Sequence, residues 1–259
     1  MTALKLAIPS KGRLKEQTEA FFAALGFCIE PMGGARGYFA RIAGLPEIEV
    51  RLLSASEIAS GVLAGDLHAG VSGEDLLREQ AGDLERLAHL LAPLGFGRAD
   101  LVVAVPKSWL DVDTMADIDD VGARLEVGAG RKLRVATKYV RSTRRFFTSE
   151  GVGHYRIVES AGATEGAPAA ETADIIVDIT TTGATLVSNG LKIIGDGLIL
   201  ASQAQLVASL DAVWTPPALA ALKQLTDAIE TVHGRTIGAQ QTSARFDRFV
   251  AALANRSAS

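Results

Sequence analysis

The chain has 259 residues, of which 48% are hydrophobic and 22% are charged, which is the composition of a globular protein with a sizeable core. Its formal net charge of −4 gives no electrostatic reason to expect nucleic acid or an anionic membrane as a partner. The single cysteine, Cys28, excludes an intrachain disulfide and a cysteine-based zinc site, and we expect it to be a small buried residue. The four histidines are scattered, which argues against a histidine metal site and predicts surface or capping positions for His68, His89, His154 and His233.

The N-terminal stretch MTALKLAIPSKGRLKEQ lacks the apolar core of a signal peptide. No apolar run approaches the roughly 18 residues that are needed to span a bilayer. We therefore expect a cytoplasmic protein that has no partner in the membrane.

Short apolar runs alternate with helical patterns along most of the chain. In chain order we expect a strand at 4–10, a helix at 12–26, strands at 37–43 and 47–53, a helix at 54–66, a strand, turn and helix over 69–80, a strand at 99–106, a strand, turn and helix over 133–151, a strand at 155–160, a short helix at 164–172, a strand at 173–179, a helix over 182–190, and strands at 191–196 and 198–209. This alternation predicts an α/β fold with mostly parallel sheets, in which ligands sit beyond the carboxyl ends of the strands.

The C-terminal part differs, because it contains two helical patterns and no strand pattern. In the first, a threonine cap and two prolines precede an apolar stripe. The apolar positions of the two helices are Leu219, Leu222, Leu225, Ile229 and Val232, and then Phe246, Phe249, Val250 and Leu253. We expect these stripes to serve packing or assembly.

The sequence DITTTGATL, residues 178–186, follows a predicted strand and begins a predicted helix. At such a turn the free backbone amides and the helix dipole attract anions, and Gly183 lets the backbone approach one closely. Threonine hydroxyls add donors, so the loop suits phosphate. Asp178 would repel phosphate, but it can accept hydrogen bonds from sugar hydroxyls or help to hold a metal ion. The pattern is typical of a phosphorylated-ribose site or, alternatively, of a threonine-capped helix after a buried strand.

Cations lie at two other strand ends. Lys11 and Arg13 stand at a helix start, where they oppose the dipole; a polyphosphate would resolve this conflict, and two solvated charges are the alternative. The second cluster contains Lys138, Arg141, Arg144 and Arg145. It fits a pyrophosphate or triphosphate contact, or an ordinary solvated helix face.

Acidic residues occur at two further helix starts. Ser72 and Gly73 precede Glu74 and Asp75, and Glu165 begins the short helix. Capping of a helix dipole is sufficient to explain these acids. Since the sequence also has no Ser–His–Asp spacing, no CxxC and no HExxH, the chemistry that it indicates is the positioning and charge stabilisation of a phosphorylated substrate.

In their order and spacing, six segments resemble the ATP phosphoribosyltransferase family. They are LAIPSKGRL, AGVSGEDLL, LGFGRADLVVAVP, LRVATKYVRSTRRFF, ATEGAPAAETADIIVDITTTGATLVSNGLKII and LILASQAQLVA. The resemblance implies transfer of the phosphoribosyl group of phosphoribosyl pyrophosphate to adenine nitrogen 1 of ATP, with release of pyrophosphate, as the first step of histidine biosynthesis. It also implies a need for Mg²⁺, with metal ligands that the sequence leaves open.

The family fold resembles type II periplasmic binding proteins, with two α/β lobes and a central cleft. By this resemblance, lobe I is residues 1–97 with 196–259, and lobe II is residues 98–195 and carries the phosphoribosyl pyrophosphate loop. Two segments depart from the usual family pattern, since SASEIASGV lacks a proline and TKYVRSTRR has valine and arginine for proline and asparagine. These departures concern the ATP contacts.

The resemblance implies a role for each matching residue. Catalysis falls to Lys11, Arg13 and Asp178, with Asp178 on the ribose hydroxyls. The residues implied for phosphoribosyl pyrophosphate are Asp178, Thr181, Thr182, Gly183, Ala184 and Thr185. Those implied for ATP are Lys11, Arg13, Gly73, Asp75, Lys138 and Arg145. Asp174 precedes Asp178 by four residues, and we expect it to have a structural role.

Long members of the family carry a C-terminal histidine-binding domain of strands and helix. Because the residues after Ala208 are predicted to be two helices, the chain resembles a short-form member, which works with a separate regulatory subunit similar to histidyl-tRNA synthetase. We expect a homo-oligomer or a hetero-oligomer. The alternatives are a non-catalytic ligand-binding or sensor domain of the same fold, which an export signal would favour, and an inactive regulatory relative, which the retained Asp178 loop disfavours.

Overall fold

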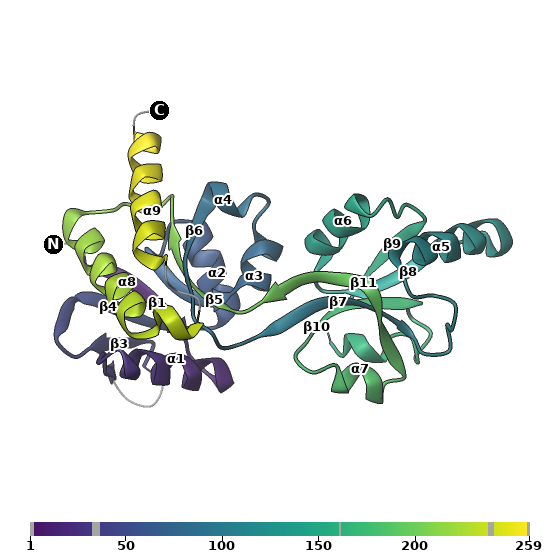
Figure 1. Ribbon diagram of the computed structural model, residues 1–259, viewed down its shortest axis with the longest axis horizontal. Helices are drawn as coiled ribbons and strands as arrows, with labels where there is room; N and C mark the ends of the chain where they lie inside the picture. The colour runs from purple at the N-terminus through teal and green to yellow at the C-terminus, as the bar shows by residue number, and fades with distance from the viewer. Residues whose placement is uncertain (1–2, 33–36, 161, 238–240, 258–259) are drawn as a thin grey trace. The chain divides into compact units, whose positions relative to one another are not determined.

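The computed structural model describes residues 3–32, 37–160, 162–237 and 241–257. The chain forms two compact units (Figure 1), which are Met1–Gly97 with Gln203–Ser259 (unit 1) and Arg98–Ser202 (unit 2). The sequence predicts the second crossing between units after Gly195, whereas it follows Ser202. The crossing lies later because β11 (Leu191–Ser202) continues to pair with β7 (Ala99–Pro106) up to Ser202.

The sheet of unit 1 has seven strands in the order β2-β3-β4-β1-β5-β12-β6. These are β1 (Leu4–Pro9), β2 (Ile29–Met32), β3 (Phe39–Ile42), β4 (Leu45–Leu53), β5 (Ala69–Gly73), β6 (Ala88–Pro93) and β12 (Ala204–Ser209). Strand β1 pairs in parallel with β4 and β5, and the outer pairs are antiparallel. The sheet is thus less parallel than predicted, but the carboxyl ends of β1, β4 and β5 meet at one edge.

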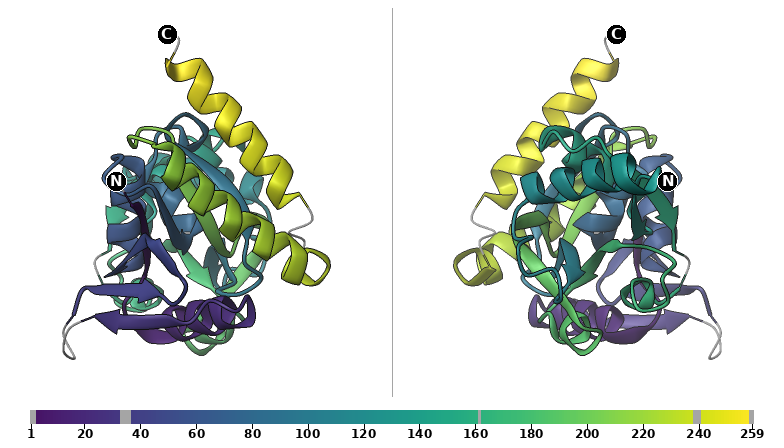
Figure 2. Two further views of the ribbon diagram at one scale, coloured as in Figure 1. Left: turned by 90° about the vertical axis from the view of Figure 1, so that its left-hand side faces the viewer. Right: turned by 90° about the vertical axis from the view of Figure 1, so that its right-hand side faces the viewer.

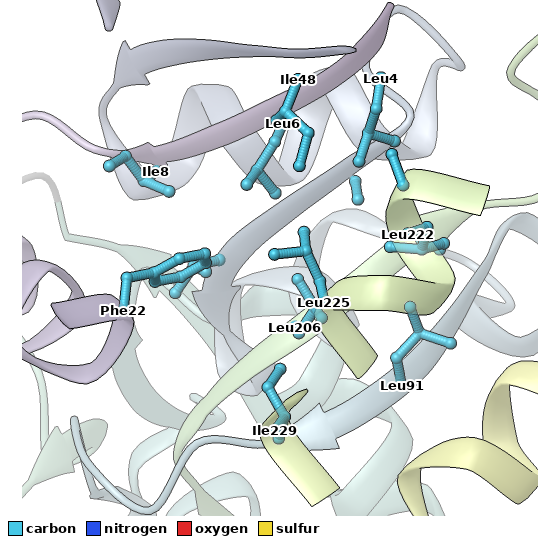
Figure 3. Packing of buried hydrophobic residues seen from close by; sticks show 14 of the residues in the cluster. Leu4, Leu6, Ile8, Phe22, Ile48, Leu91, Leu206, Leu222, Leu225 and Ile229 are labelled. Carbon is cyan, nitrogen blue, oxygen red and sulfur yellow. The ribbon is translucent and has the colours of Figure 1, made fainter. Parts of the chain in front are cut away.

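Helices cover both faces of this sheet. The elements on one face are α1 (Gly12–Ala24), α8 (Pro216–Ile237) and α9 (Thr242–Ser257), and those on the other are α2 (Ala55–Leu63), α3 (Glu74–Gln80) and α4 (Leu84–Leu87). Strand β1 shows why, because Leu6 and Ile8 face the first set while Ala7 between them faces the second. Figure 3 shows Leu222 and Leu225 of α8 beside the buried side chains of the sheet.

The C-terminal helices lie next to each other (Figure 2), and their apolar stripes serve packing within unit 1. Phe246 and Phe249 are buried, while Val250 and Leu253 are partly buried against the same core. Val232 departs from the predicted stripe, since its side chain is 47% exposed. The apolar spacing therefore predicted both helices and most of their buried faces.

Unit 2 has a five-stranded sheet in the order β11-β7-β10-β8-β9. Its remaining elements are β8 (Leu133–Thr137), β9 (Tyr155–Glu159), β10 (Ile175–Thr180), α5 (Met115–Ala129), α6 (Val140–Ser149), α7 (Ala184–Ser188) and the 3₁₀ turn η1 (Thr164–Gly166). Helices α5 and α6 pack on one face, and α7 packs on the other. Strands β8 and β10 run in parallel, so their carboxyl ends lie side by side.

Two expectations drawn from composition are wrong. Cys28 is exposed, just before the edge strand β2, rather than buried. His68 is only 4% exposed, rather than a surface residue. The His154 ring is half-exposed and makes a 3.0 Å hydrogen bond to Asp119, while the side chain of His233 lies outside the described residues. Within the described ranges, no helix is both long and apolar enough to cross a membrane.

His68 is held as one neutral tautomer. The Lys5 backbone amide donates to Nδ1 at 3.0 Å, so Nδ1 cannot carry a proton. The proton is therefore on Nε2, which donates to the Val213 carbonyl oxygen at 3.0 Å. The ring also packs edge-on against Trp214, with 4.9 Å between centroids. His68 thus ties β1 to the segment that enters α8.

Acid is expected to destabilise unit 1 through His68. Burial lowers the pKa of His68, a hydrogen bond to Val213 opposes that shift, and the charges of Lys5 and Arg51 lower the pKa further. The unfolded chain therefore binds a proton that the folded chain excludes. Stability from this residue is complete above about pH 6.5 and falls as the pH drops below it, by at most ~1.4 kcal/mol per pH unit.

Urea unfolding between about pH 8 and about pH 5 measures this slope. A Trp109→Phe background leaves Trp214 as the one fluorophore, and Trp214 lies in unit 1. His68→Gln keeps a donor and an acceptor without a titration in this range, so it should flatten the slope. His154→Gln is the matched control, because His154 is a half-exposed histidine of unit 2. A slope that His68→Gln leaves unchanged would contradict the prediction.

Candidate functional site

A pocket of 350 Å³ opens in unit 2 where the carboxyl ends of β8 and β10 lie side by side. Its lining residues are Ala99, Lys138, Glu165, Asp178, Ile179, Thr180, Thr181, Thr182, Thr185 and Leu186. They come from the start of β7, the turn after β8, η1, the end of β10, and α7. This is the edge of a sheet at which the sequence predicts a binding site.

Asp178 is the most buried polar residue of this pocket, at 9% exposure. It lies on β10 between β7 and β8, where its Cα pairs with that of Val102. Oδ1 accepts a hydrogen bond from the Ile179 amide at 2.9 Å and lies 3.5 Å from Lys138 Nζ. The strand therefore holds a carboxylate rigidly at the pocket wall, with one lysine beside it.

Residues 181–185, which we call the threonine loop, turn sharply at Gly183. The φ of Gly183 is 74°, in the left-handed region that favours glycine. Its amide donates to Thr180 Oγ1 at 2.8 Å, so the loop closes on itself. The Thr182 amide donates no hydrogen bond within the described part of the chain. The side chains of Thr182 and Thr185 are exposed at the pocket. The loop thus presents an amide and hydroxyls to an incoming anion, as the sequence predicts.

Glu165 also lines the pocket, although its sequence position is explained by capping alone. The structure places it in η1, a turn of three residues, rather than in the predicted helix over 164–172. A single 3₁₀ turn has little dipole to cap, so capping is a weak reason for the acid. The sequence Gly166-Ala167-Pro168 favours a turn, and this signal predicts a shorter helix.

Asp174 lies outside the pocket and pairs with two arginines. Arg131 Nη1 and Arg134 Nη2 lie 2.7 and 2.9 Å from its carboxylate oxygens, and the Arg134 amide donates to it at 2.8 Å. Burial opposes ionisation of Asp174, but the hydrogen bonds from Arg134 and Arg131 outweigh it and lower its pKa to about 2. The residue joins the start of β10 to β8, which is a structural role.

Lys138 and Arg145, two members of the basic cluster after β8, occupy different places. Lys138 lines the pocket beside Asp178, whereas Arg145 is exposed on α6 and is not among the lining residues. The structure therefore brings Lys138, but not Arg145, to the threonine loop. Lys138 was implied as an ATP contact, and its place is with the residues implied for phosphoribosyl pyrophosphate.

The other candidate residues belong to unit 1, at the edge where β1, β4 and β5 end. Lys11 is the N-cap of α1 and Arg13 is in its first turn, and both side chains are exposed. Gly73 caps α3, and a Cβ there would lie 2.4 Å from Asp75 Oδ1, so a larger residue would displace this carboxylate. Asp75 is 8% exposed, which fits a structural position at the turn as well as a site.

Comparison with known proteins decides the family. The model of the HisG family, ATP phosphoribosyltransferase, matches residues 54–231. The ATP phosphoribosyltransferase of Caulobacter vibrioides (strain NA1000 / CB15N) is 62% identical over 229 residues, which are 88% of this chain and 72% of the relative. The chain belongs to the ATP phosphoribosyltransferase family. It is an enzyme of histidine biosynthesis that transfers the phosphoribosyl group of phosphoribosyl pyrophosphate to adenine nitrogen 1 of ATP.

A second enzyme and a solved structure of the same family are also similar to this chain. The enzyme of Bradyrhizobium diazoefficiens is 54% identical over 248 residues, which are 96% of this chain and 76% of that enzyme. Among solved structures, an ATP phosphoribosyl transferase (HisG:HisZ) complex from Thermotoga maritima has a TM-score of 0.63 and 28% identity, and covers 88% of this chain and 98% of its own.

The fold likeness extends to ligand-binding proteins. The GluR0 ligand-binding core in complex with L-glutamate has a TM-score of 0.50 at 10% identity, and covers 96% of this chain and 98% of its own. At this identity the likeness concerns the fold alone. The predicted type II periplasmic-binding-protein-like architecture of two α/β units is confirmed, and nothing in the comparisons favours the sensor alternative.

Proposed function

We propose that the pocket of unit 2 binds phosphoribosyl pyrophosphate. Residues Thr181–Thr185 hold the 5-phosphate with the Thr182 amide and the threonine hydroxyls, and Asp178 accepts hydrogen bonds from the ribose hydroxyls. The observation that supports this division is that the strand-held Asp178 carboxylate and the threonine loop line the same pocket. A phosphate and a polyol recognised side by side are the two ends of a phosphorylated ribose.

The chemistry is a displacement at the anomeric carbon. The bond from that carbon to the pyrophosphate oxygen breaks, and a bond to adenine nitrogen 1 forms, so that pyrophosphate leaves. Because adenine is a weak nucleophile and carries no proton on this nitrogen, orientation matters more than a general base, and we assign none. Positive charge develops on the sugar, and the fixed Asp178 carboxylate stabilises it.

ATP and pyrophosphate are assigned to the turns of unit 1. Lys11 and Arg13 supply charge for phosphate oxygens, since the two exposed cations at the start of α1 are otherwise unfavourable beside the helix dipole. Gly73 and Asp75 belong to a neighbouring turn at the same sheet edge. Arg145 remains a proposed ATP contact on unit 2, outside the pocket.

The residues of the pocket suit Mg²⁺. Asp178 and Glu165 both line the pocket with carboxylate oxygens, and Mg²⁺ is commonly held by one or two carboxylates together with substrate phosphates and water. No set of three or more protein ligands for a metal occurs in the described part of the chain. When bound, the ion would neutralise charge on the leaving pyrophosphate.

The similar structure from Thermotoga maritima is a HisG:HisZ complex, which supports a regulatory partner for this chain. We infer that the chain works in a hetero-oligomer, in the cytoplasm, with a subunit that resembles histidyl-tRNA synthetase.

One assay tests both the proposed reaction and the proposed need for a regulatory partner. The purified chain is mixed with ATP, phosphoribosyl pyrophosphate and Mg²⁺, with pyrophosphatase to draw the reaction forward, and formation of phosphoribosyl-ATP is followed. We expect product, and less than about two-fold inhibition of the isolated chain by histidine at about 1 mM. Strong inhibition of the isolated chain would contradict the proposal that regulation needs a partner subunit. Absence of product, both alone and with the regulatory subunit, would contradict the enzyme activity.

A further inference from the structure

Lys138 shares its pocket with two carboxylates, Asp178 and Glu165. Its Nζ lies 3.5 Å from Asp178 Oδ1, and Glu165 lines the same pocket. Of the described residues, Lys138 is the only ion-pair partner of Asp178, and Glu165 makes no ion pair. The pocket therefore holds one positive and two negative side chains, and a substrate with many negative charges must enter it.

The ion pair between Lys138 and Asp178 is weak, so another charged group can displace the lysine. The Lys138 side chain is 49% exposed, whereas that of Asp178 is 12% exposed, so water screens the lysine and weakens the attraction. The lysine stem is flexible, and in the same position Nζ lies 5.5 Å from the centre of the Tyr139 ring, a contact that does not depend on Asp178. The carboxylate is fixed by β10, so the lysine is the partner that moves.

We propose that Lys138 takes the place beside Asp178 that a divalent cation takes when the substrate binds, and that it then turns to a phosphate oxygen of phosphoribosyl pyrophosphate. This rests on the proposed function of the pocket. A compact ammonium and a divalent cation compete for the same carboxylate oxygens, and each repels the other. Phosphate oxygens then offer Lys138 a stronger, charge-assisted partner. Lys138 is thus a positioning residue that keeps the Asp178 carboxylate aligned before the metal and substrate arrive.

The proposal makes two opposite predictions for Lys138→Met. Without substrate, removal of the competing ammonium should tighten Mn²⁺ binding to the pocket by about 5- to 10-fold. With substrate, loss of the phosphate contact should raise KM for phosphoribosyl pyrophosphate by about 10-fold while kcat changes less than about 3-fold. Electron paramagnetic resonance of free Mn²⁺ measures the first effect, and steady-state kinetics measures the second.

Lys107→Met is the matched control, because Lys107 is an exposed lysine of unit 2 outside the pocket, and its loss changes the net charge equally. Lys138→Arg should keep the charge and restore weak Mn²⁺ binding. If Mn²⁺ binds Lys138→Met and Lys107→Met equally, the proposed exchange, in which a divalent cation replaces Lys138 beside Asp178, is wrong. If Mn²⁺ binding tightens but KM stays at the wild-type value, the turn toward the substrate phosphate is wrong. A circular dichroism spectrum confirms that each variant is folded.

The Asp178→Asn variant separates this proposal from the function on which it rests. If Asp178→Asn loses use of phosphoribosyl pyrophosphate while Lys138→Met behaves as wild type, the pocket assignment stands and the exchange is overturned. If Asp178→Asn keeps wild-type kinetics and Mn²⁺ binding, the pocket assignment itself is overturned.

Discussion

Asp178→Asn is expected to lower kcat/KM for phosphoribosyl pyrophosphate by about 10²- to 10³-fold, which corresponds to roughly 3–4 kcal/mol of transition-state stabilisation. The substitution keeps the shape of the side chain but removes the charge that faces the developing positive charge of the sugar. It also weakens the acceptor for the ribose hydroxyls and one oxygen ligand for a metal. Most of the loss should fall on phosphoribosyl pyrophosphate, with KM for ATP nearly unchanged.

Initial rates with each substrate varied in turn measure this effect. Asp100→Asn is the control, because Asp100 is an exposed aspartate on β7 that pairs with the same strand, β10, at Thr180. Thr182→Ala should give a smaller loss of about 10-fold, since it removes one hydroxyl and leaves the backbone amide in place. Wild-type kinetics for Asp178→Asn would show that the pocket binds something else.

Asp174, just before β10, and Asp178, within it, show what the sequence alone can and cannot predict. The strand pattern, the glycine and the threonines predict a phosphate loop after β10, and the structure places Asp178 beside it. The arginine partners of Asp174 lie about 40 residues away in sequence, at Arg131 and Arg134. Their pairing follows from the parallel contact of β8 with β10, which no local pattern determines.

Elements that were not predicted divide into two kinds. Helix α5 has clear local signals, because Thr114 and Asp117 form a capping box and Gly130 ends the helix with a φ of 62°. Strands β2 and β6 have none, since they are the short edges of the unit 1 sheet and Pro31 lies within β2. Edge strands are defined by their neighbours, so their existence depends on tertiary packing.

Burial of polar groups is the other property that the sequence did not predict. His68 is buried because an amide and a carbonyl oxygen satisfy both its nitrogens, and those partners come from Lys5 and Val213. Glu165 faces the pocket because the chain makes a three-residue turn there. For His68 a long-range backbone arrangement decides the role of the side chain, and for Glu165 a local turn does.

Asp174→Asn should have the opposite outcome from Asp178→Asn, with stability lost and activity kept. Its pKa of about 2, against an ordinary value of 3.8, corresponds to at most about 2 kcal/mol of folding free energy at neutral pH. Because the folded pKa is depressed, this contribution is complete above about pH 4 and is lost as the pH falls toward about pH 2. The difference in unfolding free energy between wild type and variant should therefore shrink over that interval.

The chain has two tryptophans, Trp109 in unit 2 and Trp214 in unit 1, which allows the effect to be localised. In a Trp214→Phe background, urea unfolding followed by Trp109 fluorescence reports on unit 2 alone. Asp111→Asn, at an exposed aspartate of the same unit, controls for the change in net charge. At a temperature where the variant is folded, its kcat/KM should stay within about two-fold of wild type, because Asp174 lies outside the pocket. Equal stability of Asp174→Asn and Asp111→Asn would mean that the arginine pair does not hold β10 to β8. A large loss of kcat/KM would mean that Asp174 takes part in the functional site.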